Sequence, residues 1–193
     1  MSIRREMLQP TGERYDFNAL ALATRDTLEE TMRLGVRPDM DALVGWEFKV
    51  YTVLEPSELF SLRKFKKGFY LEDPTRDPGL GINGYTVKVH SNTLGEPWID
   101  RTRMGNPRRS LWFDVYPVSL TEIDNKYPNA LLLNYGLSPK NGLLEPGRML
   151  RDYVVQVYED NTDLLLGKSF MALGNMRVPL TFTVLERHNE SNL

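Results

Sequence analysis

Most of the chain alternates apolar and polar residues with the period of two that is typical of half-buried β-strands. Eight segments show this pattern, are enriched in β-branched or aromatic residues, and are bounded by turn residues. They are residues 44–53, 65–72, 82–90, 111–118, 130–135, 149–158, 164–173 and 178–187. No long helical pattern separates them, which disfavours parallel βαβ units. The predicted fold is therefore mainly β, an antiparallel up-and-down barrel of about eight strands.

A helical pattern precedes the strands. In residues 16–34 apolar side chains recur at spacings of three and four, and Gly35 follows as a helix stop. Two short helices are predicted to follow Pro38 and Pro56. The elements divide the chain into an N-terminal extension (1–15), one barrel domain with its N-terminal helix (16–188) and a tail (189–193).

Period-two alternation also assigns side chains to the two faces of a strand. In the first strand, Trp46 and Phe48 lie opposite Glu47. In the last strand, Phe182 and Val184 share the apolar side. We expect the apolar faces to point into the barrel, with the helix closing one mouth or packing on the wall. For residues 111–118 both alternations carry large apolar residues, so the facing of this strand stays open.

The composition excludes several classes of site. The 193 residues include 24 Lys+Arg and 26 Asp+Glu, a net charge of −2, so no positive surplus exists to hold a nucleic-acid backbone. The absence of cysteine excludes disulfides, thiolate zinc sites, iron–sulfur clusters and cysteine nucleophiles. His90 and His188 are the two imidazoles and are both expected at the surface. They lack metal-binding spacing, so neither a metal nor a cofactor is predicted.

No targeting signal is recognisable in the sequence. The first residues carry positive charge, but no apolar stretch of the length of a secretory signal follows them. The apolar runs are far shorter than the roughly 20 residues of a membrane helix. We expect a cytoplasmic protein without a membrane span.

The segment Leu43-Val44-Gly45-Trp46-Glu47-Phe48 joins a predicted helix to the first strand. It resembles the opening of calycin barrels, the superfamily of lipocalins and fatty-acid-binding proteins. Residues 63–69, 132–136, 150–153 and 182–187 further resemble segments of small bacterial barrels with a GXWXG motif. The resemblance implies that Gly45 lets Trp46 plug the barrel floor and that Arg187 stacks on this indole. The alternative for Arg187 is a solvated position at the strand end.

The face assignments give a set of candidate ligand-binding residues. These are Trp46, Phe48, Lys67, Phe69, Tyr85, Tyr153, Met171 and Phe182. Lys67 shares a face with two phenylalanines, so an inward orientation would place an ammonium group among aromatic rings. Burial would lower its pKa and suit it to bind an anion or to act as an amine nucleophile. The alternative is that Arg63–Lys67 form a solvated basic edge.

Two tyrosines have equally open roles. Tyr153 shares a face with Val155, and Tyr85 shares one with Val87, so each phenol either meets a ligand or is satisfied within the protein. Alternation sends Asp152 to the face opposite Tyr153, so these neighbours cannot converge on one site.

Two loop motifs suggest anion binding. Residues 79–84 spell Gly-x-Gly-x-x-Gly, but they precede a strand rather than a helix, which favours a turn. Residues 91–110 form a long connection containing Arg101, Arg103, Arg108 and Arg109. This loop could attract a carboxylate or phosphate, or it could be a solvated mobile loop.

These features favour non-covalent binding of a small, largely apolar ligand, with a carboxylate as an optional polar end. The alternative is an isomerase or cyclase that acts on a hydrophobic substrate in the same cavity. Tyr153, Tyr85 or Lys67 would then be candidates for its acid or base, but the sequence assigns no catalytic residue. A third hypothesis is a packed barrel that acts through Trp98, Trp112 or Tyr116 on its outer surface. A strongly shifted pKa inside the barrel would favour the enzyme. The protein is expected to be a monomer or homodimer.

Overall fold

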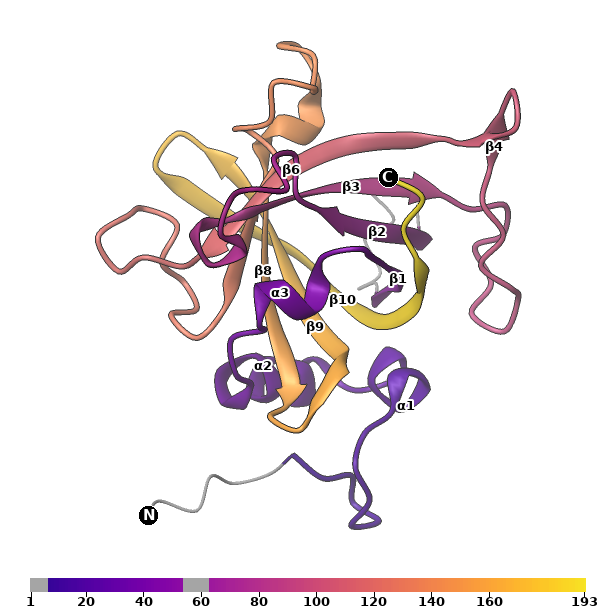
Figure 1. Cartoon of the computed structure of the whole chain (residues 1–193). Helices are drawn as coiled ribbons and strands as arrows, with labels where there is room; N and C mark the ends of the chain where they lie inside the picture. Colours follow the sequence, from indigo (N-terminus) through magenta and orange to yellow (C-terminus); the bar gives the residue numbers. More distant parts are fainter. Residues whose placement is uncertain (1–6, 54–62) are drawn as a thin grey trace.

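The computed structural model describes residues 7–53 and 63–193, and its main strands form one closed antiparallel barrel (Figure 1). The strand order around the barrel is β1-β10-β9-β8-β7-β6-β3-β2. The strands are β1 (Trp46–Val53), β2 (Lys64–Tyr70), β3 (Ile82–Lys88), β6 (Arg109–Pro117), β7 (Leu131–Asn134), β8 (Leu150–Tyr158), β9 (Asn161–Leu173) and β10 (Met176–Glu190). Each pairs with its neighbour along the chain, and β1 pairs with β10 to close the barrel. The predicted up-and-down barrel is confirmed.

A small hairpin interrupts the long connection between β3 and β6. It consists of β4 (Thr102–Arg103) and β5 (Asn106–Pro107), which pair only with each other. Its turn contains Met104 and Gly105, both at positive φ. The predicted loop therefore has a hairpin of its own outside the barrel sheet.

The helical segment expected over residues 16–34 is two helices, α1 (Phe17–Ala21) and α2 (Arg25–Leu34). Two helix starts explain the break. The Asp16 side chain accepts a hydrogen bond from the Ala19 amide, and the Thr24 side chain accepts one from the Thr27 amide.

The helix expected after Pro38 is α3 (Met40–Leu43), whereas the one expected after Pro56 lies outside the described residues. Two short 3-10 helices, η1 (Pro78–Leu80) and η2 (Pro146–Met149), occupy loops. Gly81, at φ 134°, joins η1 to β3, so the glycine-rich motif leads from a short 3-10 helix into a strand and does not open a helix. Within the described ranges, no helix has the length and apolar character needed to cross a membrane.

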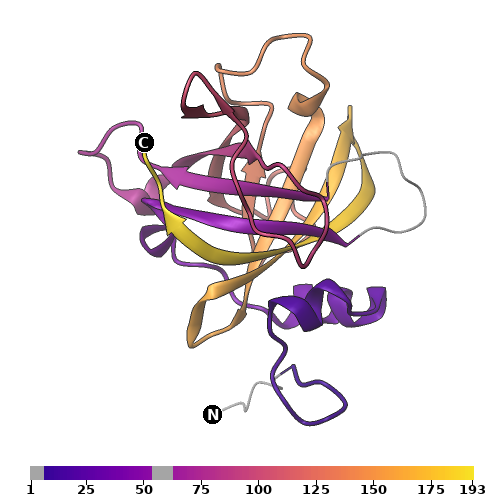
Figure 2. The same ribbon diagram turned by 90° about the vertical axis from the view of Figure 1, so that its right-hand side faces the viewer.

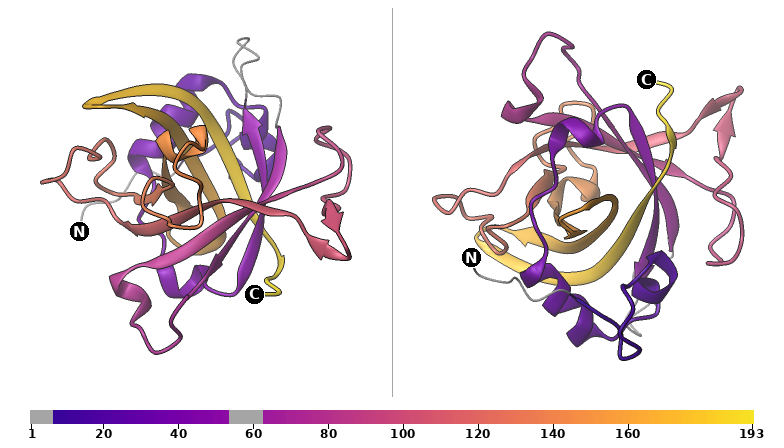
Figure 3. Two further views of the ribbon diagram at one scale, coloured as in Figure 1. Left: turned by 90° about the horizontal axis from the view of Figure 1, so that it is seen from above. Right: turned by 60° about the horizontal axis from the view of Figure 1, so that its bottom comes forward.

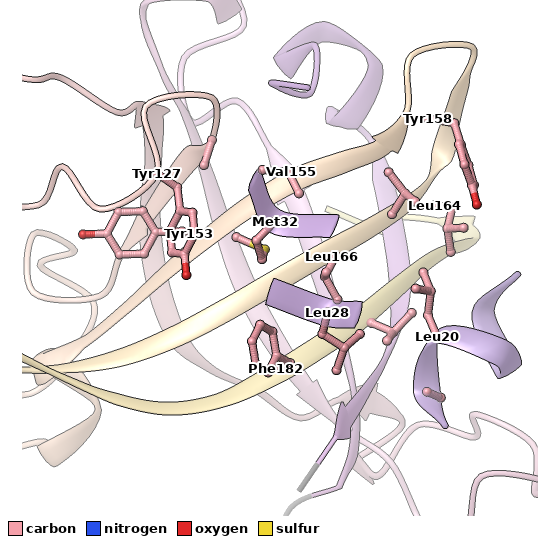
Figure 4. Close-up of a cluster of buried hydrophobic side chains, with 14 of the residues drawn as sticks. Leu20, Leu28, Met32, Tyr127, Tyr153, Val155, Tyr158, Leu164, Leu166 and Phe182 are labelled. Atoms are coloured by element: carbon pink, nitrogen blue, oxygen red, sulfur yellow. The ribbon is translucent and has the colours of Figure 1, made fainter. Parts of the chain in front are cut away.

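Helices α1 and α2 cover the outer face of strands β8, β9 and β10 (Figures 2 and 4). Leu28 and Met32 of α2 belong to one buried cluster with Val155, Leu166 and Val184. Since the inner face of these strands is also buried, this wall of the barrel is apolar on both sides. Its alternation therefore carries little information about which face points inward.

Figure 3 shows the barrel ribbon from two further directions. The barrel interior contains a second apolar cluster, to which several strands contribute. It includes Phe48, Val50, Phe69, Ile82, Phe113, Val115, Leu131, Leu133, Val154, Leu165 and Leu185. Met40 and Leu43 of α3 pack against the same cluster. Helix α3 therefore covers the end of the barrel at which β1 begins.

The orientation expected for the last strand is wrong. Phe182 and Val184 point outward to the helices, and Thr183 and Leu185 point inward. The helical layer buries the outer face, so the more apolar alternation is the outer one. Strand β6, whose facing was open, places Phe113 and Val115 in the interior cluster.

Candidate functional site

A group of polar side chains lies on the inner face of the barrel, and nearly every strand contributes to it. The members are Thr52, Lys67, Thr86, Ser110, Asp152, Ser169 and Thr183, with Tyr135 directly after β7. Directly paired residues of neighbouring strands share a face. Lys67 pairs with Thr86, Thr86 with Ser110, and Asp152 with Ser169, so these side chains all face the interior.

A buried ion pair lies at the centre of this polar group. The Lys67 Nζ donates a hydrogen bond to Asp152 Oδ2, and the Tyr135 hydroxyl donates to the same oxygen over 2.8 Å. The Lys67 and Asp152 side chains are 1% and 5% exposed, respectively. The Lys67 Nζ also lies 5.5 Å from the ring centre of Phe113 and 5.6 Å from that of Tyr135. The lysine is thus held by one carboxylate and by aromatic faces.

This ion pair crosses the barrel. Strands β3, β6 and β7 separate β2 from β8 on one side, and β1, β10 and β9 separate them on the other. The two residues therefore come from opposite walls. On the side of α3, Phe48, Phe69 and Phe113 pack edge to face in sequence, with ring centres 5.6 and 5.9 Å apart.

The pair fixes the ionisation of its carboxyl group. Burial raises the pKa of Asp152, but the charge of Lys67 and the hydrogen bonds from Lys67 and Tyr135 outweigh burial and hold this pKa below its ordinary value. Burial and the neighbouring Asp152 charge raise the pKa of Tyr135 well above its ordinary value. At neutral pH Asp152 is therefore ionised and Tyr135 is protonated.

Three polar atoms of the inner face are buried without a hydrogen-bond partner among the described residues. They are Asp152 Oδ1, Ser110 Oγ and Thr183 Oγ1. Leaving one such group unsatisfied costs about 1–3 kcal/mol. A donor brought to Asp152 Oδ1, together with a group that can pair with the two hydroxyls, would offset this cost.

The polar group lies toward the end of the barrel opposite α3. Because β1 starts at the α3 end, the antiparallel order places the starts of β6 and β8 and the end of β7 at the other end. Ser110, Tyr135 and Asp152 lie at these positions. Apolar side chains on the inner face at this end, Phe65, Leu111, Leu150 and Met171, are only partly buried. This half combines a polar floor with an apolar rim.

The structure brings together some of the residues expected to bind a ligand. Phe48, Lys67 and Phe69 lie in the interior, and Trp46 packs against the interior cluster from the α3 end. Met171 pairs with Leu150 on the inner face at the opposite end.

Tyr85, Tyr153 and Phe182 lie on the outer face instead, which corrects their expected inward orientation. Tyr153 and Phe182 are buried beneath the helical layer. Tyr85 belongs to an outer aromatic group with Tyr70 and Trp112, and its hydroxyl donates to Glu47 Oε1 over 2.9 Å.

Gly45 and Arg187 form the structural surroundings of Trp46. Gly45 has φ 82°, a backbone conformation that residues other than glycine rarely adopt. Its amide donates a hydrogen bond to the Phe69 carbonyl. The Arg187 guanidinium lies 4.7 Å from the Trp46 ring centre, the arrangement that the family resemblance implies. Its Nη2 also donates to the Ala42 carbonyl over 2.9 Å. These contacts join α3 to the first and last strands.

Sequence reasoning missed Asp152 and Tyr135. The alternation that separates Asp152 from Tyr153 was the available signal, since only one of these neighbours can face inward. No sequence signal pairs Asp152 with Lys67, 85 positions away along the chain.

Both histidines are exposed, His90 beyond β3 and His188 on β10. Among residues 7–53 and 63–193, no three His, Asp or Glu side chains gather in an arrangement that could hold a metal ion.

The fold and the site together define a closed antiparallel barrel with a buried ion pair across its interior. Comparison of the chain with protein-family models and with curated proteins finds no match.

Proposed function

We propose that the protein binds a small, largely apolar molecule in the half of the barrel opposite α3. The observation that carries this proposal is Asp152 Oδ1, a buried carboxylate oxygen on the inner face that has no hydrogen-bond partner within residues 7–53 and 63–193. The partly buried rim of Phe65, Leu111 and Leu150 supplies apolar contacts for the rest of the ligand. The calycin-like sequence features support a barrel of this ligand-binding kind.

The polar end of the ligand is best a neutral hydrogen-bond donor. Lys67 already has Asp152 as its counter-ion, so a carboxylate in the same place would bring an unbalanced negative charge into a buried site. A hydroxyl or amide can donate to Asp152 Oδ1 and can also pair with the Ser110 and Thr183 hydroxyls. The charges of the site therefore favour an alcohol or amide over the carboxylate considered from the sequence.

The pKa shifts favour binding over acid–base catalysis. A general acid or base works best with a pKa near the operating pH. The pKa of Asp152 is shifted downward and that of Tyr135 upward, so both move away from neutrality. The ion pair suits a fixed recognition element better than a proton-transfer group.

Native mass spectrometry of the purified protein, followed by denaturing extraction, tests for a bound molecule. We expect a neutral compound with a long apolar part. Displacement of the fluorescent dye Nile red by 1-decanol and by decanoate tests the polar end, with the alcohol expected to compete better. Failure of the barrel to take up Nile red, together with an empty native mass, would overturn the proposal.

Two variants locate the site within the barrel. Tyr135→Phe and Thr183→Val remove one interior hydroxyl each and should change 1-decanol affinity about threefold to tenfold. The matched controls are Tyr153→Phe on the outer wall and Thr162→Val on the exposed β9 start, which should leave the affinity unchanged. Equal effects of the interior and outer variants would place the dye outside the barrel.

A further inference from the structure

A second candidate site lies on the outer face of the barrel. The β4–β5 hairpin projects beyond the end of β3 (Figure 1). An open hollow of about 410 Å³ lies between this hairpin and the start of β6. Arg103, Asn106 and Pro107 line it from the hairpin, and Arg108, Arg109 and Trp112 line it from the following segment. Leu193 completes the lining. Its volume is within the usual range for small-molecule sites.

The hollow concentrates positive charge in a chain whose net charge is −2. Among the described residues, no carboxylate forms an ion pair with Arg103, Arg108 or Arg109. Three guanidinium groups around one hollow thus lack a counter-ion within the described chain.

Arg109 shows which kind of anion would fit. Its guanidinium stacks 4.8 Å from the Tyr85 ring centre, and its Nε and Nη2 are buried without a hydrogen-bond partner in the part of the chain that the structure describes. These two atoms form the side edge of the guanidinium, which can bind two oxygens of one carboxylate or phosphate. Arg109 lines the hollow, and the hairpin residues 102–106 beside it are all exposed.

We propose that this hollow binds a small organic phosphate or carboxylate that carries a flat unsaturated group. The arginines bind the oxyanion, and the Trp112 ring supplies a flat surface beside them. The site is separate from the barrel interior, because Trp112 and Tyr85 lie together on the outer wall.

Three ligands that share a benzene ring but differ in the polar group distinguish a phosphate, a carboxylate and a neutral hydroxyl as the preferred ligand group. Phenyl phosphate, benzoate and the neutral benzyl alcohol are titrated against the full chain by calorimetry and by tryptophan fluorescence. We expect one of the two anions to bind, with weaker binding as the salt concentration rises. The tighter of the two identifies the preferred oxyanion. Equal binding of benzyl alcohol, or no binding of either anion, would overturn the proposal.

Variants test the arginines directly. The double variant Arg103→Ala/Arg108→Ala should weaken anion binding at least about tenfold. Arg109→Lys keeps the charge and removes the two-donor edge, and it should weaken binding by a similar factor. Arg25→Ala/Arg33→Ala on α2 removes the same number of positive charges and should leave binding unchanged, since both residues lie outside this hollow.

Thermal melting checks that each variant is folded. The double variant changes two exposed residues and should keep the melting temperature of the parent. Unchanged anion affinity in a folded double variant would contradict the site. Fluorescence changes that persist in Trp112→Phe would contradict the role of this ring.

Discussion

Arg187 covers the indole of Trp46, with its guanidinium carbon 4.7 Å from the ring centre and 5.3 Å from that of Phe48. The arginine comes from the last strand and the tryptophan from the first, and the two strands close the barrel. Arg187 also pairs with Asp163 of β9. One cation thus connects three adjacent strands at the end covered by α3.

We expect Trp46→Ala to lower the free energy of unfolding by about 2–3 kcal/mol, less than the 3–5 kcal/mol of a fully buried aromatic residue. The reason is that Trp46 is only partly buried. A double-mutant cycle with Arg187→Met, measured by urea denaturation, should give a coupling of about 0.5–2 kcal/mol. A loss below about 1 kcal/mol for Trp46→Ala would show that the indole does not support the barrel end.

The Lys67–Asp152 pair should respond unequally to single and double replacement. Lys67→Met alone leaves a buried, unpaired carboxylate and should cost about 3–5 kcal/mol. Lys67→Met/Asp152→Leu removes both charges and should restore most of this loss. Urea denaturation of the single and double variants measures the difference. A double variant as unstable as the single one would mean that the pair itself, rather than its balance of charge, holds the barrel.

The same pair predicts acid sensitivity. Because the pKa of Asp152 is lower in the folded state, its stabilising contribution is full above the unfolded pKa and is lost as the pH falls through the folded pKa. The free energy of unfolding should therefore decrease below about pH 4. The decrease should be less steep in Lys67→Met/Asp152→Leu, although Glu47 and Asp124, whose pKa values are also lowered, retain their part. Identical acid profiles would contradict this assignment.

Gly84 should not tolerate a side chain. A Cβ at this position would overlap the Phe113 ring, which lies directly against the glycine. Gly84→Ala should therefore destabilise the barrel by about 1–3 kcal/mol. Gly95→Ala is the matched control, because no described residue has an atom within 4 Å of its Cβ position and its φ is not positive. Thermal unfolding that shifts equally in both variants would contradict the close packing.

The helical layer should contribute substantially to stability. Leu28 of α2 is 1% exposed against the outer face of the barrel, so Leu28→Ala should cost about 2–5 kcal/mol. Leu22→Ala, at a residue 78% exposed between α1 and α2, should change the free energy of unfolding by less than about 0.5 kcal/mol. Equal small effects in chemical denaturation would mean that α2 is only loosely attached.

The strands could be predicted because turn residues mark their ends and because apolar and polar residues alternate along them with a period of two. Facing was predictable for β1, where Trp46 and Phe48 alternate with charged residues and one side is clearly wetter. It failed for β10 because both alternations become buried, one in the barrel and one under α2. A pattern within one strand cannot reveal a layer supplied by another part of the chain.

The candidate site was only partly accessible to sequence reasoning. Lys67 could be singled out because Phe65 and Phe69 flank it on the same face. Its partner Asp152 could not, because the pairing depends on β2 and β8 lying on opposite walls of the closed barrel. Such a contact follows from closure and shear, which a single sequence does not encode locally.

The two-sided burial of β8–β10 has a consequence for aggregation. A closed barrel has no free strand edge on which another chain could add a strand. Detachment of α1 and α2 would nevertheless uncover Tyr153, Val155, Leu166 and Val184 as one continuous apolar surface. The helices therefore act as a shield, and self-association under mild destabilisation should begin from this wall rather than from the strand edges.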